Sequence, residues 1–153
     1  MYLAFKLIHV IAVIVFLGNI TVGVFWKAWA DRTKNAAIIA HTMEGIIRAD
    51  RIFTIPGVIL IVIGGVGAAF AADLSILKTG WIFWGLVLFV LAGIAFGPLS
   101  RSQRQLLVLA KSGDLDAYDA ASNQWNVFGT IVLVLPFLAA AIMILKPLLP
   151  AFP

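Results

Sequence analysis

Four long apolar stretches constrain the fold of this chain more than any other feature. They cover approximately residues 3–26, 52–72, 80–99 and 127–145. A hydrocarbon core of about 30 Å takes about 20 helical residues to cross, and each stretch is about this long. Lipid offers the backbone no hydrogen-bond partners, so helices, which pair their own backbone groups, are expected. We therefore predict an all-α membrane protein, a single domain over residues 1–153 built as a bundle of four transmembrane helices.

Composition agrees with this prediction. The chain is 63% hydrophobic and 12% charged, whereas soluble domains carry about 25% charged residues. The bilayer is therefore an expected partner of most of the surface. The chain has no cysteine, which excludes disulfides, iron–sulfur clusters, thiol catalysis and c-type haem. Basic residues that flank the spans explain the net charge of +4, so we expect no nucleic-acid partner.

The basic residues are concentrated on one side of the predicted bundle. The segments 27–51 and 100–126 contain Lys27, Arg32, Lys34, Arg48, Arg51, Arg101, Arg104 and Lys111. The other side has only Lys78 and Lys146, with Lys6 inside the first stretch. Because cytoplasmic loops carry an excess of Lys and Arg, we predict a multi-pass protein of the bacterial inner membrane. Loops 27–51 and 100–126 are then cytoplasmic, and both termini face outward.

Short amphipathic helices are expected in the two cytoplasmic loops. Residues 33–50 have an apolar face, so this segment either lies on the membrane surface or extends the second span inward. Ser102 and Gln105 match a capping box and predict a new helix. Asp116 or Asp119 is then expected to cap the helix that runs into the fourth span.

Glycine and proline indicate how the spans pack and bend. The third stretch has a G-x-x-x-G pair, Gly93 and Gly97. The second stretch contains Gly57, Gly64, Gly65 and Gly67. Small residues let helices approach closely in lipid, which leaves two interpretations open: packing within one bundle, or a seam for a homodimer or another membrane protein. Pro56 and Pro98 are expected to kink their helices.

The predicted spans have no Asp or Glu in their interior. Ion-coupled carriers usually bind and release the ion at an intramembrane carboxylate. This absence argues against ion-coupled antiport. Asn19 and Thr21 are the polar residues of the first span and are expected to bond across helices.

Lys6 and His9 are the ionisable residues of the first span and share one helix face. His9 lies about 9 Å below the outer edge of the membrane, where a polar group needs a partner. A neutral imidazole can also bind haem iron. Two interpretations of His9 remain open: a hydrogen bond to a neighbouring helix, or an axial ligand of haem b.

Other residues at the depth of His9 could complete a haem site. Met143 is a candidate sixth ligand, and Trp81 and Trp84 could form the walls of a slot for the flat macrocycle. Ordinary interface or packing roles are the alternative for all three. His41 lies on the opposite side of the membrane, so it and His9 cannot bind the same haem.

Arg48 and Arg51 are one turn apart near the inner end of the second span. They could hold an anionic headgroup, a propionate or a phosphate. The alternative is that they only set the topology, with one ion pair to Asp50.

Two segments of the chain resemble known families. The run Lys6-Leu7-Ile8-His9-Val10 is similar to the K-x-x-H start of several small bacterial membrane proteins. Residues 48–57, RADRIFTIPG, resemble the start of the second span in an uncharacterised family of predicted integral membrane proteins, and this likeness extends over nearly the whole chain. That family implies no activity. Lys6 and His9 also carry a distant similarity to HemJ-type protoporphyrinogen oxidases, which implies haem b bound through a first-span histidine.

Three functions follow from these observations. The first is binding of haem b or a related redox ligand at His9, with Lys6 as propionate partner and quinone as electron partner. The second is a non-enzymatic scaffold or subunit that packs through glycine-rich faces. The third is a facilitative transporter, which needs a polar path across the bundle. No nucleophile–base pair or phosphate loop is present, and whether the protein is an enzyme stays open.

Overall fold

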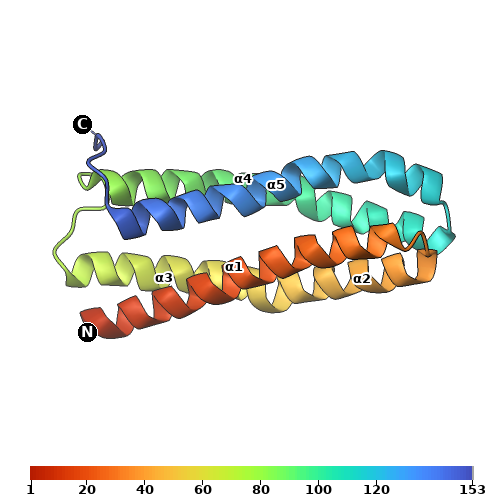
Figure 1. Cartoon of the computed structure of the whole chain (residues 1–153). Coiled ribbons are helices and arrows are strands. Elements are labelled where there is room, and N and C mark those ends of the chain that lie inside the picture. The colour runs from red at the N-terminus through yellow and green to blue at the C-terminus, as the bar shows by residue number, and fades with distance from the viewer. Residues whose placement is uncertain (153) are drawn as a thin grey trace.

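The computed structural model describes residues 1–152 and consists of long helices that lie side by side (Figure 1). The helical elements are α1 (Tyr2–Arg32), α2 (Ala36–Ala49), the π-helical turn η1 (Asp50–Thr54), α3 (Ile55–Ala71), α4 (Gly80–Ser112) and α5 (Leu115–Leu145). Because α2, η1 and α3 form one continuous run, the described chain has four helices long and apolar enough to cross a membrane. The predicted all-α architecture of four spans is confirmed. Both termini lie at one end of the bundle (Figure 1).

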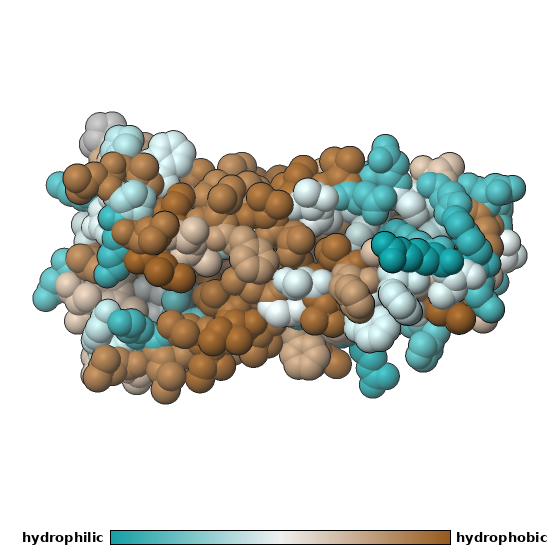
Figure 2. Space-filling model, in the orientation of Figure 1, coloured by the Kyte–Doolittle hydropathy of each residue, from teal (hydrophilic) through white to brown (hydrophobic). Residues whose placement is uncertain are grey.

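The helices are longer than the apolar stretches that predicted them. They have 31 to 36 residues, which corresponds to about 46–54 Å, whereas the hydrocarbon core is about 30 Å thick. Hydrophilic side chains gather at the end of the bundle that holds the α1–α2 and α4–α5 turns, and the adjoining part is brown with apolar residues (Figure 2). The helices are therefore longer than a hydrocarbon core requires. We call the hydrophilic end that holds these turns the basic end.

The extra length comes from helices that do not stop where the apolar stretches stop. The predicted amphipathic segment 33–50 corresponds to α2, which runs directly into η1 and α3 and so extends the second span. The capping box predicted at Ser102 is wrong, because α4 continues unbroken through it. The Ser102 side chain is 2% exposed and faces the core, where it cannot cap a helix.

Polar side chains and one glycine define the turns at the basic end. The Asn35 side chain accepts hydrogen bonds from the backbone N–H groups of Ala37 and Ile38 and so caps α2. Gly113 ends α4 in the left-handed conformation, with φ of 78°. The cap of α5 is Asp114, which accepts from Ala117 N–H at 3.0 Å. The prediction of Asp116 or Asp119 as the cap is wrong, because the helix begins earlier, directly after Gly113.

The helices pack as two hairpin-like pairs that are joined at the basic end. Helix α4 packs along α5, α1 packs against α3, and α2 packs against α4. The most deeply buried side chains of these helices, all exposed to 2% or less, are Tyr118, Lys27, Ile39, Met43, Leu106 and Ser102. These residues all belong to the basic half, so the tightest core lies where the bundle leaves the apolar region.

Glycine allows α1 and α3 to pack closely, whereas two glycines of α4 make no close contact. A Cβ atom on Gly64 would lie 2.8 Å from the backbone nitrogen of His9, so α1 and α3 approach each other through this glycine. By contrast, a Cβ atom on Gly93 or Gly97 would meet nothing within 4 Å in the described chain. Packing within one chain therefore accounts for the glycines of α3 and leaves the G-x-x-x-G pair of α4 unused.

The second span contains a π-helical turn at the point where a proline was expected to kink it. Ile55 N–H bonds to the Asp50 carbonyl, five residues earlier. Pro56 follows directly and has no N–H to continue the α-helical pattern. The wider turn directs both Asp50 and Thr54 into the bundle, where they are 9% and 3% exposed. Turns of this kind occur frequently at functional sites.

Candidate functional site: a cavity beside Asp50

A cavity of about 340 Å³ lies between α1, α2, α4 and α5 in the basic half of the bundle. Cavities that bind small molecules typically measure about 300–1,000 Å³ and are mostly apolar with a few polar groups. Apolar side chains make up most of this wall, including Ile20, Ile46, Phe96, Leu99 and Val132. Its polar lining includes Asn19, Thr42, Asp50 and Gln103. We call it the Asp50 cavity.

Asp50 is held by side chains from three helical segments. Its Oδ1 accepts hydrogen bonds from Thr54 Oγ1 at 2.7 Å and from Asn19 Nδ2 at 3.2 Å. Its Oδ2 accepts one from Gln103 Nε2 at 2.9 Å. Asn19 Nδ2 also donates to Thr54 Oγ1 at 2.9 Å, which closes the network between α1 and η1. An ionised carboxylate can accept about four hydrogen bonds, so Oδ2 keeps room for one more donor.

Asp50 lies inside a continuous helix. The second span was predicted to begin at Ile52, which placed Asp50 outside it. The helix instead runs unbroken from Ala36 to Ala71, and the Asp50 side chain is 9% exposed near its middle. The expectation that no span has an Asp or Glu in its membrane interior stays a prediction, because Asp50 directly precedes Arg51 and the apolar stretch 52–72.

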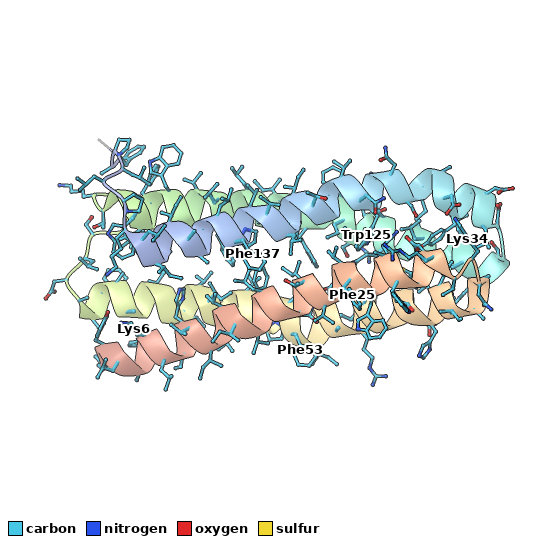
Figure 3. All side chains as sticks on the ribbon, viewed as in Figure 1. Lys6, Phe25, Lys34, Phe53, Trp125 and Phe137 are labelled. Atoms are coloured by element: carbon cyan, nitrogen blue, oxygen red, sulfur yellow. The ribbon has the colours of Figure 1, made fainter. Side chains whose placement is uncertain are left out.

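Trp125 supplies an aromatic side chain to the wall of the cavity. This side chain is 4% exposed and lies between α5 and α1 (Figure 3). The indole Nε1 has almost no accessible surface and no hydrogen-bond partner among the described residues. The wall of the Asp50 cavity thus combines a carboxylate that can accept a hydrogen bond with an aromatic ring.

The cavity reaches the surface between α1 and α2. Trp26, His41, Thr42 and Gly45 line it on this side, and Trp26, His41 and Gly45 are exposed. A Cβ atom on Gly45 would meet nothing within 4 Å, and one on Gly23 would meet only Ile46, at 3.9 Å. The two glycines therefore leave space that larger side chains would fill.

A buried lysine lies next to the cavity and has partners of its own. Lys27 is 1% exposed, and its Nζ bonds to Asp31 Oδ2 at 2.6 Å and to Ser122 Oγ at 3.4 Å. The same Nζ lies 5.4 Å from the ring centre of Tyr118 and 4.8 Å from that of Trp125. Tyr118 donates a hydrogen bond to the other carboxylate oxygen of Asp31, at 2.7 Å. This cluster joins α1 to α5, and Lys27, predicted as a topology-setting loop residue, is part of the core.

His9 makes a hydrogen bond to the neighbouring helix. Its Nδ1 lies 2.8 Å from the carbonyl oxygen of Ile61 in α3. A carbonyl can only accept, so Nδ1 carries the hydrogen and Nε2 is left as the unprotonated nitrogen of the neutral ring. Gly65 makes room for the ring, because a Cβ atom there would lie 3.0 Å from it. The structural interpretation of His9 is confirmed, and the free Nε2 leaves the haem interpretation as a prediction.

The other residues predicted for the haem site have separate contacts. Lys6 is exposed and lies 5.7 Å above the Tyr2 ring. The rings of Trp81 and Trp84 meet the C-terminal segment: Lys146 Nζ is 5.1 Å from the Trp81 ring, and Trp84 Nε1 donates to the Pro150 carbonyl at 3.0 Å. Met143 packs against α4, where a Cβ atom on Gly85 would lie 2.6 Å from its methyl carbon. None of these contacts brings them to His9.

Arg48 and Arg51 lie one turn apart at the end of α2 and in η1, and neither forms an ion pair with Asp50. Both side chains are exposed and line a surface groove together with His41. The predicted pairing with Asp50 is wrong, because neutral donors occupy that carboxylate. His41, Gly45 and Arg48 lie on one face of α2 and line this groove together.

A facilitative transporter would need polar residues of several spans in one cavity. Of Asn19, Thr21, Thr54, Asn126 and Thr130, only Asn19 lines the Asp50 cavity. The hydroxyls of Thr21 and Thr130 bond to carbonyls of their own helices, so the expected cross-helix bond of Thr21 is wrong. The expected cross-helix bond of Asn19 is confirmed.

Comparison with known proteins gives a family and no activity. Residues 3–147 match the family described as "Predicted integral membrane protein (DUF2269)". No curated protein and no solved structure matches the chain. The match includes all four long helices of the described structure. The chain therefore belongs to this family of predicted integral membrane proteins.

Proposed function

We propose that this integral membrane protein binds a small, mostly apolar molecule in the Asp50 cavity. The observation that carries the proposal is an open acceptor position on Asp50 in the wall of a mostly apolar cavity. A ligand that fits this wall carries a hydrogen-bond donor on an apolar body. The pattern matches ligand sites generally, in which apolar contacts give affinity and a few polar groups fix orientation.

The opening between α1 and α2 indicates how such a molecule enters. Its exposed residues, Trp26, His41 and Gly45, lie where the apolar surface gives way to the hydrophilic basic end. Lipid-soluble molecules with polar ends concentrate at such a border. The ligand would therefore come sideways from the leaflet at the basic end and not along the axis of the bundle.

The test uses dansylamide, a fluorescent naphthalene that carries both a donor and an acceptor. The full chain, in mild detergent, is titrated with dansylamide, and fluorescence enhancement is recorded. Gly23→Leu fills the cavity from α1 and should weaken binding about tenfold or more, the equivalent of about 1.4 kcal/mol. Gly18→Leu is the matched control, because Gly18 lies on the same helix, is exposed and has nothing within 4 Å of its Cβ position.

The polar anchor is tested separately with Asp50→Asn. The amide keeps the size of the side chain and loses part of its acceptor capacity, so affinity should fall by several-fold to about tenfold. Equal binding by the wild type, Gly23→Leu and Gly18→Leu would mean that the dye only enters the micelle, and the proposal would fail.

A second candidate function is haem b binding at His9. The observation that favours it is the His9–Ile61 hydrogen bond, since iron-binding histidines commonly hold one ring nitrogen in this way and bind through the other. His9 would serve as the axial ligand of such a site, while the Asp50 cavity and the groove at Arg48 do not reach it. A Soret band in protein purified from haem-supplemented cells, lost in His9→Ala, would support this function, and a colourless folded protein would exclude it.

A further inference from the structure

A basic groove on the outside of α2 lies beside the mouth of the Asp50 cavity and shares His41 and Gly45 with it. The groove has a volume of about 510 Å³. Arg48 and Arg51 supply its positive charge, and His41 and Leu107 of α4 form part of its wall. We call this site the basic groove.

Both arginines of the basic groove are free to bind an anion. Within residues 1–152, no carboxylate lies within ion-pair distance of Arg48 or Arg51. The nearest acid in sequence, Asp50, points into the bundle because of the π-helical turn. The groove contains one acid, Glu44, and its carboxylate is paired with Lys111. The charge of the groove is therefore positive and uncompensated.

The basic groove borders the apolar surface of the protein. Directly after Arg51, the chain exposes Ile52, Phe53 and Ile55, at 52%, 47% and 49%. Phe53 lies near the middle of the bundle in Figure 3, where the brown surface of Figure 2 meets the hydrophilic end. An amphiphile with its charge at the arginines could lay its chains along these residues. This is the depth at which phospholipid phosphates lie in a bilayer.

We propose that the basic groove binds the phosphate of an anionic phospholipid in the leaflet at the basic end. Arg48 and Arg51 form charge-assisted hydrogen bonds to the phosphate oxygens. Ile52, Phe53 and Ile55 contact the acyl chains. The proposal does not rest on the small molecule proposed for the Asp50 cavity, since Arg48 and Arg51 line the groove and do not line the cavity, although the two sites share His41 and Gly45.

Native mass spectrometry of the full chain tests this proposal. The protein, in mild detergent, is mixed with equal amounts of phosphatidylglycerol and phosphatidylcholine, and bound lipids are counted. Phosphatidylglycerol should be preferred, and Arg48→Gln with Arg51→Gln should reduce the preference about tenfold. The matched control is Arg101→Gln with Arg104→Gln, a pair with the same spacing that is also exposed and lies outside the groove.

The outcomes separate the alternatives. An equal reduction in both double variants would mean that net charge alone attracts the lipid and would overturn the proposal. Displacement of phosphatidylglycerol by millimolar inorganic phosphate would assign the groove to a free anion, which also overturns it. If the arginine variant does not purify, Glu44→Gln serves instead, because removal of the one acid should raise the preference for phosphatidylglycerol.

Discussion

Two buried ionisable side chains, Asp50 and Lys27, are held in different ways. Neutral amide and hydroxyl donors surround Asp50, so its remaining acceptor position stays open to the cavity. Lys27 instead has a counter-ion, Asp31, and lies against two aromatic faces. A residue that is fully paired within its own chain has a structural role, whereas an incompletely paired one can bind a ligand. This difference is why we assign the site to Asp50 and not to Lys27.

The ion pair of Lys27 should respond unequally to loss of each partner. Lys27→Met keeps a long side chain against Tyr118 and Trp125 and leaves Asp31, 29% exposed, with its Tyr118 hydrogen bond and water. We expect a loss of about 1 kcal/mol or less, because the Asp31 carboxylate that remains is partly exposed and water can solvate it. Asp31→Ala leaves Lys27 charged, buried and without its counter-ion, and should cost about 3 kcal/mol.

Thermal unfolding in detergent, followed by circular dichroism, measures this difference. Asp116→Ala is the control for removal of an exposed carboxylate near the same end. A larger loss for Lys27→Met than for Asp31→Ala would contradict the structural role given to this cluster.

At the scale of single helices, contact between α1 and α3 depends on the absence of a side chain at Gly64. Gly64→Ala places a methyl group 2.8 Å from the backbone of His9, so the helices must separate, and we expect a loss of about 1–3 kcal/mol. Gly97→Ala, on the open face of α4, should be neutral or stabilise by up to about 1 kcal/mol, because alanine favours helix more than glycine. Unfolding midpoints of the two variants give the comparison. If both alanines stabilise, the close approach of α1 and α3 is not a feature of the folded protein.

The sequence predicted the number of helices well and their ends poorly. Hydropathy reports which residues lipid can cover. The sequence becomes more polar after Leu99, although α4 continues to Ser112. A better guide was present in α4, where the buried residues Leu99, Ser102, Leu106 and Ala110 follow one another at helical spacing. The S-x-x-Q motif at Ser102 suggested a helix start because a capping box and a buried serine look the same in sequence.

The candidate site was less predictable than the fold. Asn19 was recognised as a residue that bonds across helices, and Arg48 and Arg51 as a cationic pair. Asp50 was named only as an ion-pair partner of the arginines, and Gln103 was not recognised, because their pairing joins residues 53 positions apart and depends on the π-helical turn. Trp125 could not be assigned to the site, since hydropathy does not distinguish a tryptophan at a membrane surface from one buried beside a cavity.

At the scale of the whole molecule, the bundle is asymmetric along its axis. One end carries both termini and the 72–79 loop, and the other carries the basic residues, the tight core and the two short turns (Figure 1). The positive-inside rule predicts that the basic end faces the cytoplasm. The Asp50 cavity would then open toward the inner leaflet, and so would the basic groove.

The orientation can be measured with single cysteines, because the chain has none of its own. Ser75→Cys lies in the loop between α3 and α4, and Ser112→Cys lies at the end of α4 at the opposite end of the bundle. Both changes are nearly isosteric, and both serines are exposed. In intact cells, a membrane-impermeant maleimide should label Ser75→Cys at once and Ser112→Cys only after permeabilisation. The reverse pattern would place the basic end outside, and the ligand and the phospholipid would then have to come from the outer leaflet.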